Sequence, residues 1–68
     1  MNPVVAGERI KKLRIEHGLS RAQLAEQIGV EASAISNYES GIRTPRDSIK
    51  IRIASVLGAS VGDIFFTE

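Results

Sequence analysis

Residues 20–41, with the sequence SRAQLAEQIGVEASAISNYESG, decide the fold. Ser20 and Gln23 have the spacing of a capping box, in which each side chain binds the other residue's backbone N–H at a helix start. Gly29 can adopt the left-handed conformation that ends a helix. A second helical stretch over residues 32–40 follows after two residues. The apolar inner face is formed by Leu24, Ala25, Ile28, Ile35 and Tyr38. Two short helices joined by a tight turn are the helix-turn-helix layout.

A longer helix is expected before this segment. Asn2 is a good helix cap and Pro3 is tolerated at the first helical position, so the pattern begins there. Gly18 is the stop signal at its other end. Gly7 lies inside this helix and weakens its first turn by about 1 kcal/mol relative to Ala.

Two further helices are expected after the segment. Asp47 can cap a helix that ends at Gly58. Residues 49–53, IKIRI, alternate strictly, which is typical of a strand. We nevertheless assign them to the helix, because a lone strand would have no partner. Ser60 and Asp63 have the spacing of another capped start, which predicts a short fifth helix.

Composition limits the fold and the chemistry. The 68 residues carry nine Lys and Arg, eight Asp and Glu, one His and no Cys, for a net charge of +1. We expect one all-α domain over residues 1–68, with no disulfide, metal site or cofactor. No apolar run exceeds three residues, which excludes a membrane helix and favours a cytoplasmic protein. No carboxylate pair, phosphate-binding glycine loop or nucleophile motif accompanies the single His, so an enzyme is not expected.

The charges are unevenly distributed along the chain. Residues 7–21 hold five basic residues and residues 41–52 hold four, whereas residues 22–40 hold three acids and no base. This distribution fits a nucleic-acid surface and solvated helix faces equally well.

The chain from Gly7 to Phe66 resembles the Cro/repressor-type helix-turn-helix family, also called lambda-repressor-like or XRE-like. The matching stretches are GERIKKLR at 7–14, HGLS at 17–20, LA at 24–25, IGV at 28–30, ISNYESG at 35–41, TP at 44–45 and IASVLG at 53–58. The resemblance implies a compact five-helix domain whose second and third helices form the helix-turn-helix. It also implies binding to operator DNA, usually as a two-fold dimer.

The resemblance assigns roles to individual residues. The expected base-reading residues are Ala32, Ser33, Ser36 and Asn37. The expected phosphate contacts are Ser20, Arg21, Gln23, Arg43, Thr44 and Arg46. Arg14 and Glu39 are expected to form a structural ion pair. Glu31 departs from the family pattern, because relatives usually carry Ser, Thr or Asp as the cap of the recognition helix.

We therefore expect a dimeric repressor that binds a pseudo-palindromic operator on double-stranded DNA through the major groove. The candidate dimer surface consists of Ile49, Ile51, Phe65 and Phe66, although the two Phe residues could equally close the core. Regulation would then rest on concentration and dimerisation or on a partner protein. The alternative is an antitoxin or adaptor that uses the same fold to bind protein, which the acidic, aromatic tail and the uncharged recognition face favour.

Overall fold

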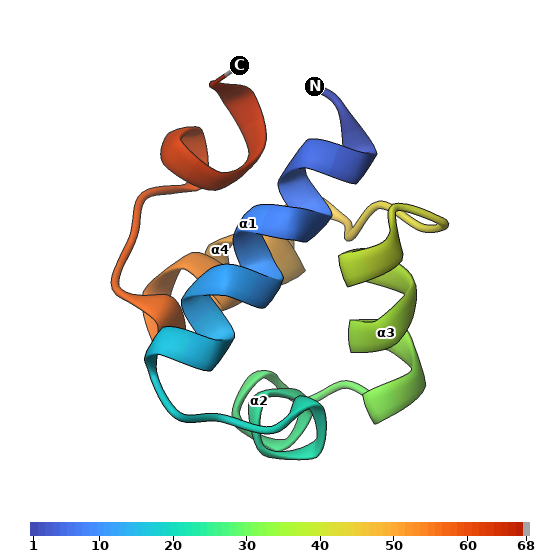
Figure 1. Cartoon of the computed structure of the whole chain (residues 1–68), viewed down its shortest axis with the longest axis vertical. Coiled ribbons are helices and arrows are strands. Elements are labelled where there is room, and N and C mark those ends of the chain that lie inside the picture. The colour runs from blue at the N-terminus through green and yellow to red at the C-terminus, as the bar shows by residue number, and fades with distance from the viewer. Residues whose placement is uncertain (68) are drawn as a thin grey trace.

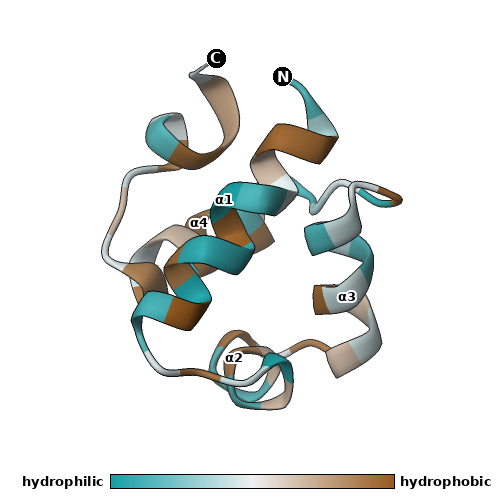
Figure 2. Ribbon diagram, viewed as in Figure 1, coloured by the Kyte–Doolittle hydropathy of each residue, from teal (hydrophilic) through white to brown (hydrophobic). Residues whose placement is uncertain are grey.

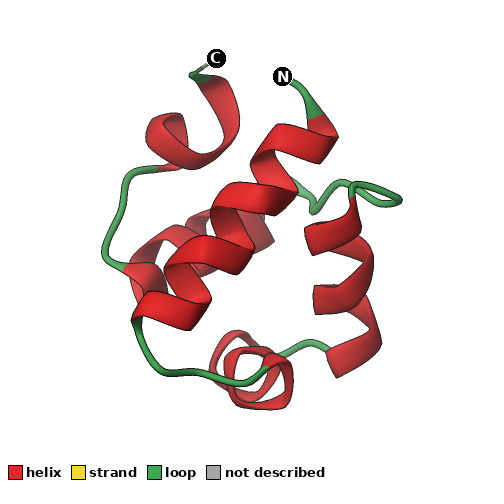
Figure 3. Ribbon diagram, in the orientation of Figure 1, coloured by secondary structure: helices red, strands yellow, loops and turns green. Residues whose placement is uncertain are grey.

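The computed structural model describes residues 1–67. Helices account for most of them, and these residues contain no strand (Figures 1 and 3). The elements are α1 (Pro3–Glu16), α2 (Arg21–Ile28), α3 (Ala32–Ser40), α4 (Asp47–Leu57) and a π-helical turn, η1 (Gly62–Phe66). The all-α, five-helix prediction is therefore confirmed.

The predicted starts of α1 and α2 are confirmed by side-chain hydrogen bonds to the first backbone N–H groups. Asn2 Oδ1 accepts from the backbone N–H of Val4 at 3.0 Å and of Val5 at 3.2 Å. At the start of α2, Ser20 N donates to Gln23 Oε1 at 2.8 Å and Gln23 N donates to Ser20 Oγ at 3.0 Å. This reciprocal pair is the expected capping box, and it fixes the first turn of α2.

Glycines shape the turn that follows α2 and the end of α3. Gly29 has a φ of 77° and Gly41 a φ of 78°, both in the left-handed region that other residues rarely adopt. Only Val30 and Glu31 separate Gly29 from α3, so the reversal between the two helices is abrupt. The turn of the helix-turn-helix thus depends on a residue without a side chain.

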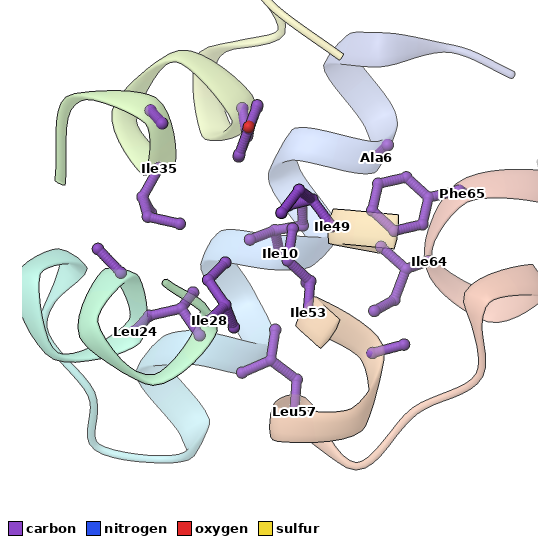
Figure 4. Close-up of a cluster of buried hydrophobic side chains, with 14 residues drawn as sticks. Ala6, Ile10, Leu24, Ile28, Ile35, Ile49, Ile53, Leu57, Ile64 and Phe65 are labelled. Atoms are coloured by element: carbon purple, nitrogen blue, oxygen red, sulfur yellow. The ribbon is translucent and has the colours of Figure 1, made fainter. Parts of the chain in front are cut away.

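The core lies where α1, α2, α3, α4 and η1 converge. In Figure 1, α1 crosses the middle of the molecule, with α4 behind it and α2 and α3 on adjacent sides. Each helix carries both hydrophobic and hydrophilic segments, as expected of helices with one buried face (Figure 2). Figure 4 shows the buried side chains that meet there, among them Ile10, Leu24, Ile28, Ile35, Ile53, Leu57 and Phe65. No helix in residues 1–67 is long and apolar enough to cross a membrane.

The start of α4 differs from the sequence prediction. Asp47 is the first residue of this helix rather than its cap, and the capping residue, Arg46, makes no side-chain capping bond. The alternating residues 49–53 are helical, as predicted, and their burial follows the helical period. Ile49 and Ile53 are buried four residues apart, whereas Ile51 between them is exposed.

The dimer prediction is wrong for Ile49, and Phe65 closes the core, which is the alternative that the sequence left open. Ile49 and Phe65 are buried in the core and cannot contact a second copy. Ile49 lies on the inward stripe of α4, and η1 turns Phe65 inward beside Ile64. The other two candidates are on the surface, with Ile51 60% and Phe66 59% exposed.

Gly7 permits the closest approach between two helices. A Cβ added at this position would lie 2.5 Å from the carbonyl oxygen of Tyr38, and it would also clash with the carbonyl oxygen of Glu39. Both obstructing atoms are backbone, so no side-chain rotation could relieve the overlap. The glycine that looked like a weak point in α1 is therefore what lets α1 pack against the end of α3.

A Gly7→Ala substitution should destabilise the protein, although Ala favours helix by about 1 kcal/mol over Gly. We expect a net loss of about 2 kcal/mol of unfolding free energy, because α1 and α3 must separate to admit the methyl group. Thermal unfolding followed by circular dichroism measures the effect. Gly62→Ala is the control, since a Cβ there meets nothing closer than Ser60 Oγ at 3.8 Å. A Gly7→Ala protein as stable as the wild type would contradict the proposed reason for this glycine.

Candidate nucleic-acid interface

The outward face of α3 is polar and free of basic residues. Ala32, Ser33 and Ser36 are exposed and Asn37 is half-buried. These four expected base readers share one face, because positions one turn apart lie above each other on a helix. The opposite face of α3 is buried against the core through Ala34, Ile35 and Tyr38. The helix thus presents hydroxyl and amide groups outward.

The loop after α3 supplies the cations that α3 lacks. Arg43, Thr44 and Arg46 are all exposed. The guanidinium of Arg43 lies 5.7 Å from the centre of the Tyr38 ring, and its backbone N–H donates to the carbonyl of Asn37 at 3.2 Å. This loop is therefore held against the end of the helix.

An open groove of about 500 Å³ brings this loop and the start of α3 to one surface. Ser33 lines it on the helix side, with Arg43, Thr44 and Arg46 on the loop side. Glu31 also lines it and places an acid among the loop cations. The side chain of Glu31 makes no capping bond, so α3 begins without the cap that helices usually have.

The expected phosphate contacts on α2 are exposed but already engaged within the protein. Ser20 and Gln23 form the capping box, which leaves the amide N–H₂ of Gln23 uncommitted among residues 1–67. Arg21 donates from Nε to Glu39 Oε1 at 3.0 Å. Sequence reasoning did not foresee this bond, because the two residues are far apart along the chain.

The structure brings Arg14 and Glu39 together as a buried ion pair. Arg14 Nε lies 2.6 Å from Glu39 Oε2, and its Nη2 lies 3.2 Å from Oε1. Arg14 Nη1 also donates to the carbonyl of Leu19, directly before the cap of α2, at 2.8 Å. One side chain of α1 therefore ties the start of α2 to the end of α3.

Three basic residues outside this surface have internal roles that the sequence did not reveal. Arg9 donates to the carbonyls of Ile64 and Thr67 and so binds η1 to α1, away from α3. Arg52 donates to the carbonyl of Ile28 at 3.3 Å, at the end of α2. Their spacing in the sequence carries no signal for these contacts, which form only in the tertiary structure.

Lys50 is the third of these residues. It is buried, and its ammonium lies 5.5 Å and 5.1 Å from the ring centres of Phe65 and Phe66. Asp47 Oδ1 lies 3.5 Å from the same ammonium. The aromatic faces and the carboxylate together compensate a charge that would be costly to bury alone.

Comparison with known proteins agrees with this geometry. Residues 10–64 match the helix-turn-helix family. This chain belongs to the helix-turn-helix family of DNA-binding transcriptional regulators. It is 39% identical over 56 residues to the HTH-type transcriptional regulator SinR of Bacillus subtilis, and the match covers 81% of this chain and 50% of SinR. An uncharacterised HTH-type transcriptional regulator of Archaeoglobus fulgidus is 32% identical over 60 residues, or 88% of this chain and 86% of that protein.

Solved structures of the family superpose closely on this helix-turn-helix protein. The P22 c2 repressor in complex with a synthetic operator has a TM-score of 0.90 at 25% identity, over 94% of this chain and 97% of that one. SinR in complex with DNA has a TM-score of 0.81 at 35% identity, over 87% and 95% of the two chains. SinR has also been solved in complex with the SinI protein, with a TM-score of 0.83 at 34% identity, over 90% and 60%.

The curated relatives differ greatly in length. The chain spans half of SinR but only 16% of a putative HTH-type transcriptional regulatory protein of Pyrococcus furiosus. The shared part is in each case the helix-turn-helix region, so family and fold are common to all of them. The lambda-repressor-like fold inferred from the sequence is confirmed by these matches.

Removing one partner of the Arg14–Glu39 pair should cost more than removing both. Glu39→Met leaves the buried guanidinium of Arg14 with only the carbonyl of Leu19 as a partner, and we expect it to lose about 3–5 kcal/mol of unfolding free energy. The double variant Arg14→Met/Glu39→Met should recover much of this loss, because two apolar side chains fill the same space. Thermal and urea unfolding measure both effects, with the exposed Arg46→Met as control. A double variant less stable than either single variant would contradict this account of the pair.

Proposed function

We propose that this chain represses transcription by binding a pseudo-palindromic operator as a homodimer, with α3 of each protomer in the major groove. The observation that carries the proposal is an exposed, uncharged face of α3 together with exposed arginines at the start of α2 and in the loop after α3. Arg21 lies at the start of α2, and Arg43 and Arg46 follow α3. A helix flanked by phosphate-binding groups is how this motif docks on a duplex.

Base recognition would rest on the four outward residues of α3. Asn37 is the most specific of them, since its amide can bind adenine through two hydrogen bonds. Ser33 and Ser36 can donate or accept, and Ala32 can contact only a thymine methyl group. No arginine or lysine on this face can read guanine, so direct discrimination between sequences would be modest.

Affinity would come mainly from phosphates. Ser20, Arg21 and Gln23 at one edge and Arg43, Thr44 and Arg46 at the other would grip the backbone on either side of the groove. Glu31 would work against them, because its carboxylate is repelled by a nearby phosphate. A hydrogen bond accepted from cytosine N4 would offset this repulsion at sites that carry a cytosine there.

Dimerisation would use the exposed part of the surface formed by α4 and η1. Ile51 and Phe66 are exposed apolar side chains on those two elements, and the ammonium of Lys50, the residue before Ile51, lies 5.1 Å from the centre of the Phe66 ring. Two copies related by a two-fold axis would place their α3 helices about 34 Å apart, one turn of the duplex. In this proposal residues 1–68 act as one domain, in the cytoplasm and without enzymatic activity.

A second candidate function is binding to a protein partner on the same fold. The uncharged face of α3 and the exposed Ile51 and Phe66 favour it, and the neighbour SinR forms a complex with SinI. Such a partner could also regulate the repressor by covering its dimer surface. The exposed cations after α3 oppose protein binding as the main role, because an uncharged protein surface gains little from them.

DNA binding is tested by selecting a preferred site from a randomised duplex library and measuring the dissociation constant across salt concentrations. Arg43→Gln/Arg46→Gln should lower the slope of log K against log salt by about 0.9 for each phosphate interaction removed, on all sequences alike. Asn37→Ala should keep the slope and reduce the preference for the selected site about tenfold. Lys12→Gln, on the side of α1 that faces η1, is the control for the loss of one positive charge away from the proposed interface, and its effect on the slope is compared with half the effect of the double variant. No binding to any DNA at low salt would overturn the function, and a salt slope without sequence preference would reduce it to non-specific binding.

The dimer is tested by sedimentation equilibrium with Ile51→Lys. The change places a charge in the proposed interface and should shift the protein toward monomer. Ile15→Lys is a close control, because Ile15 is 58% exposed on α1 and Ile51 is 60% exposed on α4. Equal self-association of both variants would exclude this surface.

A further inference from the structure

Glu39 accepts from two arginines at once. Its side chain is only 3% exposed, near the end of α3. Arg14 holds both carboxylate oxygens, at 2.6 Å and 3.2 Å, and Arg21 donates from Nε to Oε1 at 3.0 Å. Arg14 already neutralises Glu39 and ties α2 to α3. The bond from Arg21 is not needed for either purpose.

The charge balance of this cluster leaves one positive charge on Arg21. Two guanidinium groups face one carboxylate, so one of them is not neutralised. Arg14 neutralises Glu39 through a two-pronged contact and is itself buried, with 9% of its side chain exposed. Arg21 is 46% exposed, and its two Nη groups make no hydrogen bond or ion pair within the part of the chain that the structure describes. The remaining charge is therefore at the surface.

We propose that Glu39 is a positioning residue that holds Arg21 by Nε, so that the Nη groups bind a DNA phosphate at the start of α2. The inference rests on the proposed function and adds to it the device that aims this contact. Arg21 would then bridge two anions, the buried carboxylate and the phosphate. Because Arg14 neutralises Glu39, the positive charge of Arg21 remains available to the phosphate.

The cluster also links the phosphate contact to the reading helix. Arg14 Nη1 binds the carbonyl of Leu19, the residue before the cap of α2, at 2.8 Å. Glu39 is the penultimate residue of α3. Glu39 thus connects Arg21, the proposed phosphate contact, to α3, the proposed base-reading helix. The distance between these two parts is fixed in the protein without DNA.

Only arginine fits both halves of this role. Its planar fork carries five donors, so Nε can bind one anion while the Nη groups bind another. Lysine keeps the charge but has a single ammonium, which cannot be held by Glu39 and reach a phosphate with the same geometry. A guanidinium already fixed by Glu39 also loses less rotamer freedom on binding than a free side chain would.

The test compares three variants on the selected site and on non-specific duplex. Arg21→Gln should lower the salt slope by about 0.9 for each bound protomer, whereas Lys12→Gln should change it by less than half of that. Arg21→Lys should keep the slope but weaken binding about threefold or more, because the charge remains and the positioning is removed. Circular dichroism confirms that each variant is folded.

A fourth measurement isolates Glu39. In the Arg14→Met/Glu39→Met background no carboxylate holds Arg21, so adding Arg21→Lys should no longer weaken binding. Should that background fail to fold, the comparison of Arg21→Lys with the wild type still decides the question.

The outcomes separate this inference from the proposed function. Wild-type binding together with equal slopes for Arg21→Gln and Lys12→Gln would mean that Arg21 serves only Glu39, which overturns the inference and leaves the function intact. Arg21→Lys binding as tightly as the wild type would overturn the positioning role. Absence of wild-type binding to any duplex would overturn both.

Discussion

The arrangement of α2 and α3 depends on one buried carboxylate. Glu39 is nearly inaccessible to water, and a lone charge there would be strongly unfavourable. It is stable only because Arg14 reaches it from α1 and Arg21 from α2. Arg14 also binds the carbonyl of Leu19, just before α2. The pair of Arg14 and Glu39 therefore connects the start of α2 to the end of α3. The apolar core brings the helices together, and the ionic cluster selects one relative position.

In the proposed function, the resulting surface would divide two tasks, the recognition of bases and the binding of phosphates. Polar groups without charge lie on α3, where contacts with bases depend on direction, and the cations lie at its edges, where contacts with phosphates depend on charge. Glu31 is the exception, because it places an acid at the start of α3 and provides no cap for it. The helix that would carry sequence recognition therefore begins without a side-chain cap, as α4 also does.

Much of this architecture could be predicted from the sequence, because caps and turns are local. Asn2, the Ser20–Gln23 box and Gly29 act within a few residues, and the structure has each where expected. The ion pair was accessible only through resemblance to a family. The dimer prediction is wrong for Ile49, since alternating apolar residues do not say which of them faces inward until the helix register is known. For Phe65 the sequence left a dimer contact and a core position open, and the structure has the core position. The bond between Arg21 and Glu39 joins distant residues and had no local signal.

The absence of a side chain at residue 7 has a consequence for how far α3 projects from the body of the protein. At this point α1 touches the carbonyls of Tyr38 and Glu39 directly, so backbone meets backbone without a spacer. A larger residue would move the end of α3 outward and carry the following loop, with Arg43, along with it. In the proposed function, residue 7 would set how far α3 projects from the body of the protein, and with it which phosphates the following loop could reach while α3 lies in the groove.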